Sequence, residues 1–231
     1  MSPTLVIAHR TCARDARENS LEGIAAAARL GAEVVEIDVR RSRSGTAFLL
    51  HDRWLTRMQH VPLRVNWASD ALLARLAVPT LVDALRAAGD AGLRVAVDTK
   101  DPAAAEVVVA AAAETGMDDR VLLWSQHMPT VRAYVRARPD AEVALLRDTF
   151  DSSATARLLA DADAIGARAV SAHQDVVTPT FIDAARERGL AVYCWYQRPD
   201  LQRAQLAEVA AAGLAGVVTD WPADARRILD T

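Results

Sequence analysis

The chain of 231 residues is predicted to be one α/β domain, a (β/α)₈ TIM barrel. Short β-branched runs alternate with Ala-, Leu- and Arg-rich stretches of helical period, which is the pattern of repeated βα units around a parallel sheet. The apolar fraction of 52% excludes a disordered chain. An open doubly wound sheet is the alternative, but no glycine-rich phosphate loop follows any predicted strand.

Eight strands and eight helices fit a compact barrel of this length. The predicted strands are Leu5–Ala8, Val34–Val39, Arg94–Asp98, Val121–Trp124, Val143–Leu146, Ala169–Ala172, Ala191–Trp195 and Val217–Thr219. The predicted helices cover residues 20–30, 80–90, 102–115, 129–137, 152–165, 179–188 and 200–212, with a last one after Pro222.

Capping residues support two of the helix starts. Asn19 with Glu22 three residues later predicts a capping box for the first helix. Thr80 with Asp83 predicts another for the second.

A hairpin interrupts the alternation after the second strand, where a second apolar run, Ala47–Leu50, leaves no room for a helix. A turn at Ser44-Gly45 would pair Asp38 with His51 and Arg40 with Leu49. Alternation along the strand then places Glu36 and Asp38 on one face, with His51 beside them.

Polar groups gather at the carboxyl ends of the predicted strands, where barrels of this kind carry their chemistry. His9-Arg10 follows the first strand, and Asp98-Thr99-Lys100 ends the third. With Glu36 and Asp38, Asp98 supplies a third carboxylate, a set that suits Mg²⁺ or Ca²⁺ better than zinc. Arg10 and Lys100 add positive charge, and the imidazoles of His9 and His51 can exchange protons. This combination predicts a phosphoryl-transfer site, and one cation with an acid and a base suits a phosphodiester.

Other candidate residues carry weaker signals. His127 and His173 follow strand ends and are expected near the pocket mouth, whereas His60 is expected at the surface. Trp195 is interpreted as a wall of the pocket. Cys12 lies close to His9 in the sequence, but no acyl-transfer constellation surrounds it.

Composition limits the partners and the compartment. The 27 basic and 30 acidic residues are mixed along the chain, so nucleic acid is not expected as a partner. No apolar run is long enough to span a membrane, and two cysteines with no leader-like N-terminus favour the cytoplasm. The oligomeric state stays open. Lys100 is the single lysine in a chain that otherwise uses arginine, so this position calls for a specific reason.

The motifs together resemble the glycerophosphodiester phosphodiesterase family, and the likeness runs almost end to end. The segments that carry it are Ala8-His9-Arg10, Glu18-Asn19-Ser20, Gly31-Ala32-Glu33, Glu36-Ile37-Asp38-Val39, Ser44-Gly45, His51-Asp52, Val78-Pro79-Thr80-Leu81, Asp98-Thr99-Lys100, Val177-Thr178-Pro179, Trp195 and Val218-Thr219-Asp220-Trp221-Pro222.

The resemblance implies a role for each matching position. His9 and His51 would be the catalytic acid and base, and Arg10 and Lys100 would bind the substrate phosphate. Glu36, Asp38 and Asp98 would hold one divalent cation, Mg²⁺ or Ca²⁺. Glu18 would contact the metal indirectly or steady Arg10, and Trp195 would line the pocket. The implied reaction is hydrolysis of a small glycerophosphodiester to glycerol 3-phosphate and an alcohol. The resemblance also implies a small insertion after the second strand. Here the insertion, about residues 43–78, is short, so it is expected to contribute a reduced lid to the pocket.

Three positions depart from the family pattern. Thr11 replaces the usual Gly and is expected to narrow the approach to the phosphate, Arg17 replaces a common Pro, and Asp98 replaces the usual Glu. The Asp at the third-ligand position also resembles sphingomyelinase D-like phospholipases, so a lysophospholipase D-like enzyme is an alternative. A barrel that binds a phosphorylated ligand without turnover is a second alternative, although such a protein needs no acid–base pair.

Overall fold

The computed structural model describes residues 3–148, 151–196 and 203–231. Eight parallel strands close on themselves, because β1 pairs with both β9 and β2. The barrel strands are β1 (Leu5–Ala8), β2 (Val34–Arg41), β4 (Arg94–Thr99), β5 (Val121–Ser125), β6 (Val143–Leu146), β7 (Ala169–His173), β8 (Ala191–Tyr196) and β9 (Gly216–Thr219). The predicted (β/α)₈ barrel is confirmed.

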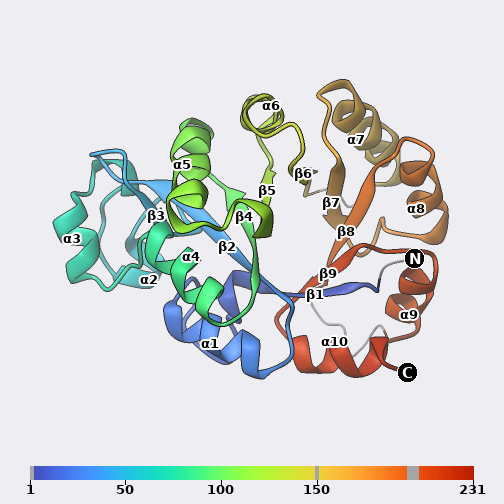
Figure 1. Ribbon diagram of the computed structural model, residues 1–231, viewed down its shortest axis with the longest axis horizontal. Coiled ribbons are helices and arrows are strands. Elements are labelled where there is room, and N and C mark those ends of the chain that lie inside the picture. The colour runs from blue at the N-terminus through green and yellow to red at the C-terminus, as the bar shows by residue number, and fades with distance from the viewer. Residues whose placement is uncertain (1–2, 149–150, 197–202) are drawn as a thin grey trace.

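Helices connect successive strands around the outside of the barrel (Figure 1). They are α1 (Leu21–Arg29), α4 (Leu81–Asp90), α5 (Ala105–Thr115), α6 (Met128–Ala137), α7 (Ser152–Ala164), α8 (Pro179–Arg186), α9 (Arg203–Ala211) and α10 (Pro222–Leu229). Short 3₁₀ turns occur at η1 (His9–Thr11), η2 (Val65–Trp67), η3 (Pro102–Ala104) and η4 (Asp118–Arg120). The predicted start of the helix over 200–212 lies outside the described residues.

Alternation along β2 assigns its side chains to two cores. Val35, Ile37 and Val39 belong to the large apolar cluster between the strands and the outer helices. Val34 belongs to the cluster that fills the barrel interior, and Glu36 and Asp38 lie on its side of the strand. The carboxylates of Glu36 and Asp38 therefore point into the barrel, next to the apolar side chains that fill its interior.

The hairpin forms, but its register differs from the predicted one. Strand β3 (Ala47–Leu49) pairs antiparallel with β2, with Arg40 opposite Phe48 instead of Leu49. Ser42 N donates to Thr46 O at 2.9 Å, so the loop holds three residues centred on Ser44, with Gly45 at φ 94°. A three-residue loop with glycine in the left-handed region shifts the pairing by one from a two-residue turn. Leu50, not His51, therefore lies next to Asp38, and Leu50 N donates to Asp38 O at 2.9 Å.

The cap of α1 also differs from the prediction. Ser20 is the N-cap, and its hydroxyl accepts a hydrogen bond from Gly23 N at 3.1 Å. Asn19 adopts φ 54° and turns its side chain toward β2, so it is not available as a cap. Thr80 caps α4 as predicted, accepting from Asp83 N at 3.1 Å.

The insertion over residues 43–78 contains β3, α2 (Thr56–Gln59) and α3 (Asp70–Arg75), grouped at the left of Figure 1. It has a small apolar core of its own, formed by Phe48, Leu50, Leu55, Val65, Ala68, Leu73 and Val78. Among the described residues, the insertion contributes only His51 to the cavity at the carboxyl ends of β1, β2 and β4. The insertion therefore forms little of the wall of that cavity.

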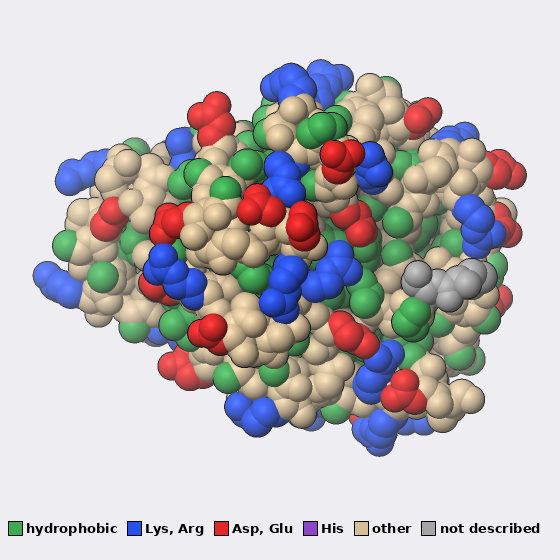
Figure 2. All heavy atoms as spheres, viewed as in Figure 1, with side chains coloured by type: hydrophobic (Ala, Val, Ile, Leu, Met, Phe, Trp, Pro, Cys, Tyr) green, Lys and Arg blue, Asp and Glu red, His purple; other side chains and the backbone are tan. Residues whose placement is uncertain are grey.

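The surface carries charges of both signs. Figure 2 shows acidic and basic side chains interspersed over the face in view. Within the described part of the chain, no helix has the length and apolar character needed to cross a membrane.

Candidate active site

A cavity of about 380 Å³ opens among the polar groups that were predicted at the strand ends. Its lining residues are His9, Arg10, Glu36, Asp38, His51, Asp98, Lys100, Trp124, Gln126, Leu146, Asp148, Ser171, Trp195, Tyr196, Val218 and Asp220. The fold therefore brings together the two predicted histidines, the two predicted phosphate ligands and the three predicted metal ligands.

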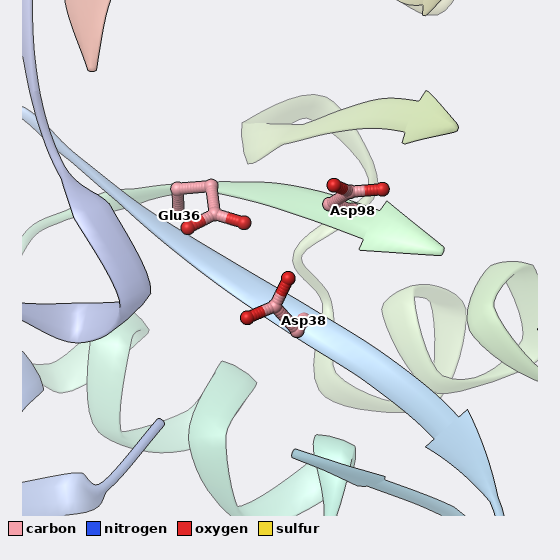
Figure 3. A group of neighbouring side chains, drawn as sticks. All are labelled: Glu36, Asp38 and Asp98. Carbon is pink, nitrogen blue, oxygen red and sulfur yellow. The ribbon is translucent and has the colours of Figure 1, made fainter. Parts of the chain in front are cut away.

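Three buried carboxylates form one side of the cavity (Figure 3). Glu36 and Asp38 come from β2, and Asp98 comes from the neighbouring β4, where it is directly opposite Asp38. One oxygen from each lies within 4.8 Å of the others. The shared interior face of two adjacent parallel strands produces this spacing.

These carboxylates have the properties of a site for a hard divalent cation. All donors are oxygens, as Mg²⁺ and Ca²⁺ prefer. Asp98 Oδ1 is buried and has no hydrogen-bond partner among the described residues, which leaves a lone pair for a ligand. Burial and the neighbouring charge of Asp38 raise the pKa of Glu36 to about 7, so three adjacent negative charges are unfavourable without a cation.

Lys100 partly compensates these charges. Its Nζ donates to Asp98 Oδ2 at 2.6 Å and lies 3.2 Å from Asp38 Oδ1. Burial alone would lower the pKa of Lys100, but Asp38 and Asp98 outweigh it and hold that pKa above its usual range. The predicted phosphate ligand therefore faces the cavity from a position beside two of the carboxylates.

The loop after β1 positions Arg10 over the same carboxylates. Arg10, Thr11 and Cys12 all have positive φ, a conformation that costs each residue about 1–3 kcal/mol. In this backbone conformation Arg10 N donates a hydrogen bond to Glu36 Oε2 at 2.7 Å, and Arg10 Nε lies 3.4 Å from Asp38 Oδ2. Local backbone strain is thus stored at the predicted phosphate site.

Asn19 fixes Asp38 from behind. Its Nδ2 donates to Asp38 Oδ2 at 2.9 Å, and its Oδ1 accepts from Asp38 N at the same distance. Burial alone would raise the pKa of Asp38. The positive charges of Lys100, His51 and Arg10, together with the hydrogen bond from Asn19, outweigh burial and hold this pKa below its usual range. Asp38 therefore stays ionised and correctly oriented.

Each candidate catalytic histidine is oriented by a carboxylate. His9 Nδ1 is 2.8 Å from Asp220 Oδ1, and His51 Nδ1 is 2.7 Å from Asp52 Oδ1. In both rings Nε2 is therefore the nitrogen left for proton exchange. Burial lowers the pKa of His9, but the hydrogen bond to Asp220 and the charges of Glu36 and Asp220 outweigh it and raise that pKa.

A chain of ion pairs connects the two sides of the cavity. Arg10 Nη1 lies 3.4 Å from Glu18, and Arg57 in turn contacts both Glu18 and Asp52 at 2.5 Å. Glu18 thus steadies Arg10 without lining the cavity itself. Through Arg57 of the insertion, the same network of ion pairs reaches Asp52, the residue that orients His51.

The wall formed by β5, β7 and β8 offers polar groups to a ligand. Trp124 Nε1 and Ser171 Oγ are buried and have no hydrogen-bond partner among the described residues. Trp195 lines the cavity as predicted. His173 does not: it is buried, lies 3.2 Å from Asp175, and packs edge-on against the Trp195 ring with centroids 4.3 Å apart.

The structure also places the remaining residues of interest. His60 is exposed, as predicted, and His127 lines a different cavity. Thr11 is fully buried and accepts from Ser20 N at 3.1 Å, so the expectation that it narrows the approach to the phosphate is wrong. Cys12 is buried, and burial raises its pKa to about 11, which leaves the thiol protonated at neutral pH.

Four supporting residues escaped the sequence-based prediction: Asn19, Asp52, Arg57 and Asp220. Three of them belong to motifs that the resemblance already included, so their place in the sequence was visible while their roles were not. Arg57 gave no signal, because nothing in a four-residue helix indicates which carboxylates its side chain can reach.

The arrangement can polarise and cleave a phosphodiester. Arg10, Lys100 and a cation held by the three carboxylates would stabilise negative charge on a phosphate in the cavity. The imidazoles of His9 and His51, which face the same space, can transfer protons. Comparison with known proteins agrees with this chemistry. Residues 9–224 match the sequence model of the Glycerophosphoryl diester phosphodiesterase family.

Individual relatives are similar over nearly their whole length. The chain is 24% identical to a glycerophosphodiester phosphodiesterase of Caldanaerobacter subterraneus, with 95% of both chains covered. Its fold matches a glycerophosphodiester phosphodiesterase from Thermotoga maritima with a TM-score of 0.82 and 17% identity, covering 99% of each chain. A phosphodiesterase from Oleispira antarctica, solved with the product sn-glycerol-3-phosphate, matches with a TM-score of 0.82 and 20% identity, covering 99% of this chain and 98% of that one. The chain therefore belongs to the glycerophosphoryl diester phosphodiesterase family and is a phosphoric diester hydrolase.

Proposed function

We propose that this single domain, residues 1–231, hydrolyses a small glycerophosphodiester to glycerol 3-phosphate and an alcohol, in the cytoplasm and with one Mg²⁺ or Ca²⁺ ion. The observation that carries the proposal is the single cavity in which three buried carboxylates, two carboxylate-oriented imidazoles, Arg10 and Lys100 meet. The product named for the Oleispira antarctica complex is the product expected here.

The cation belongs with Glu36, Asp38 and Asp98, where it would offset charge on the phosphate oxygens. Arg10 and Lys100 bind the same phosphate group and orient its phosphorus toward the histidines. Trp124 and Ser171 present donors to the hydroxyl groups of the substrate.

His9 and His51 move the protons. His51 accepts the proton of the attacking water or glycerol hydroxyl, and His9, which Asp220 keeps protonated to higher pH, donates to the departing alkoxide. The P–O bond to the alcohol breaks as the new P–O bond forms. If the glycerol hydroxyl attacks first, water opens the resulting cyclic phosphate with the two roles reversed.

Product release tests the proposal. Purified protein is incubated with glycerophosphocholine, glycerophosphoethanolamine or lysophosphatidylcholine, with Mg²⁺, Ca²⁺ or EDTA, and glycerol 3-phosphate is measured through its dehydrogenase. We expect turnover of the first two substrates only with a cation. Release of choline from lysophosphatidylcholine alone would replace the proposal with the lysophospholipase D-like alternative, and no turnover of any substrate would support the non-catalytic one.

Three histidine variants separate catalysis from general damage. His9→Ala and His51→Ala are expected to lose about 10²–10⁴-fold in kcat/KM. His60→Ala is the matched control and should retain full activity. His60 is exposed and lines neither the catalytic cavity nor the cavity that contains His127. Full activity in either of the first two variants would overturn the proposed acid–base pair.

A further inference from the structure

A second cavity, of about 260 Å³, lies beside the first, between the insertion and the ends of β2 and β4. Its lining includes Arg40 and Arg41 from β2, Arg53 and Arg64 from the insertion, and His127 at the start of α6. Lys100 lines both cavities. Nothing in the proposed reaction uses the four arginines.

Positive charge dominates this second cavity. Among the residues that the structure describes, its lining holds four arginines and Lys100 but a single acid, Asp101, in a chain whose net charge is -3. Asp101 is already paired with Arg41, whose Nε donates to its carboxylate at 2.9 Å. The charges of Arg40, Arg53 and Arg64 are therefore not balanced by any acid that lines the cavity.

The backbone holds the two segments that carry Arg53 and Arg64 next to each other. Trp54 and Arg64 form an isolated antiparallel bridge, and Val65 N donates to Arg53 O at 3.0 Å. Both arginines line the cavity. Burial lowers the pKa of Arg40, and the charge of nearby Arg53 lowers it further, against the effect of Asp38 and other acids. Like charges kept this close are stabilised when an anion binds between them.

Arg64 is fixed in place and has an unused donor. Its guanidinium lies over the rings of Trp54 and Trp67, at 5.9 and 5.3 Å from their centroids. Its Nε is buried without a hydrogen-bond partner among the described residues. A planar guanidinium held against aromatic rings, with a free N–H donor, suits the way in which arginine recognises phosphate oxygens.

We propose that this cavity is a second anion site, which binds a phosphate dianion through Arg40, Arg53 and Arg64. Arg40 connects it to the catalytic cavity, since its Nε donates to His51 O at 2.8 Å and its Nη1 to Lys100 O at 3.2 Å. The phosphate is either free phosphate or a phosphomonoester carried by the alcohol part of the substrate. Only this second source depends on the proposed function.

Calorimetric titration with inorganic phosphate in EDTA tests the site without relying on turnover. The Arg53→Gln/Arg64→Gln variant is expected to weaken binding at least tenfold. Arg43→Gln, an exposed arginine of the insertion outside the cavity, is the matched control and should leave binding unchanged. Arg10→Gln removes the catalytic phosphate ligand and should also leave this binding event in place.

Two results would overturn the proposal: phosphate binding that survives Arg53→Gln/Arg64→Gln, or binding that Arg10→Gln alone abolishes. If the glutamine variant folds poorly, Arg53→Lys/Arg64→Lys keeps the charge, and it must then bind phosphate more tightly than a matched Arg53→Met/Arg64→Met variant of equal melting temperature. Equal affinity of these two variants would also overturn the site.

Kinetics then identify the source of the phosphate. Glycerophosphoinositol and its phosphorylated form, glycerophosphoinositol 4-phosphate, differ by one phosphomonoester. If the substrate carries the bound phosphate, Arg53→Gln/Arg64→Gln raises KM for the phosphorylated diester alone. If the site takes free phosphate, KM is unchanged for both diesters while the calorimetric loss remains. Failure to turn over either diester would count against the proposed function and leave the phosphate titration valid.

Discussion

Asn19 and Asp38 exchange two hydrogen bonds, one from the Asn19 amide to the Asp38 carboxylate and one from the Asp38 backbone to the Asn19 carbonyl. The contact joins the start of α1 to the middle of β2, nineteen positions apart in the sequence. It holds a candidate metal ligand by both its side chain and its backbone. Groups that orient a ligand in this way commonly contribute 10–100-fold to metal affinity.

Asn19→Ala is therefore expected to weaken Mg²⁺ binding by about 10–100-fold, measured by calorimetry. The matched control is Ser20→Ala at the neighbouring position. Ser20 is the cap of α1, so its loss should reduce the free energy of unfolding by about 1 kcal/mol and leave Mg²⁺ affinity unchanged. Equal Mg²⁺ affinity in both variants would contradict the orienting role of Asn19.

The raised pKa of Glu36 predicts that cation binding depends on pH. Because this pKa is about 7 in the metal-free protein, the carboxyl group is mostly protonated at pH 6, and a cation must displace that proton to bind. Below pH 7 the apparent affinity should fall about tenfold per pH unit as pH falls, and above it the affinity should level off.

Calorimetry at pH 6 in two buffers of different ionisation enthalpy measures this displacement directly. The two binding enthalpies should differ by the amount expected for release of close to one proton per cation. At pH 8 the difference should nearly vanish, which provides the control within the same protein. A cation affinity that stays constant from pH 5.5 to 7.5 would show that Glu36 is already ionised or is not a ligand.

The barrel and the cluster of candidate metal ligands could be predicted from the sequence because both depend on local alternation. The residues Val35, Ile37 and Val39 mark one face of a buried strand, so Glu36 and Asp38 must share the other face. Side-chain partners across the fold could not be predicted in this way. The pairing of His9 with Asp220 joins residues 211 positions apart, and only the closure of β1 on β9 brings them together.

Small backbone details also escaped the prediction. One additional loop residue moved the hairpin register, and a single positive φ at Asn19 moved the cap of α1 to Ser20. In both cases a local rule allowed two neighbouring solutions, and contacts made elsewhere selected one. For Asn19 the deciding contact is the one with Asp38, so the residue that failed as a cap serves the site.

The contact of His9 with Asp220 predicts the protonation of His9. The negative charge of Asp220 and its hydrogen bond to His9 both raise the pKa of His9. Asp220→Asn removes the charge and weakens the hydrogen bond, so the pKa of His9 should fall. Carbon and nitrogen resonances of the imidazole, followed by NMR through a pH titration, measure the change. Because His9 would then hold its proton only at lower pH, the alkaline limb of the kcat/KM profile should move to lower pH.

Asp52→Asn is the matched control for that experiment. Asp52 orients His51 instead, so its loss should leave the His9 resonances unchanged. We expect both variants to lose about 10–100-fold in kcat/KM, since each leaves one ring poorly oriented. A His9 pKa that stays constant or rises in Asp220→Asn would exclude Asp220 as the group that keeps His9 protonated.

Lys100, the one lysine of the chain, provides the last prediction. Its side chain is only 15% exposed, and its ammonium nitrogen contacts Asp98 and Asp38 at once, at 2.6 and 3.2 Å. The guanidinium of arginine is planar, longer and bonds in a fixed fork, so it cannot occupy the same point between two converging carboxylates without entering the cation site. Lys100→Arg is therefore expected to lower both Mg²⁺ affinity and kcat/KM by about 10–100-fold, although the charge is kept.

Arg94→Lys is the matched control, because it makes the reverse exchange at the other end of β4. Arg94 is partly exposed and its ion-pair partner, Glu142, is 3.8 Å away, so this variant should change neither Mg²⁺ affinity nor kcat/KM. If Lys100→Arg turns over glycerophosphocholine as fast as the unmodified protein, the geometry of the site does not require lysine at this position.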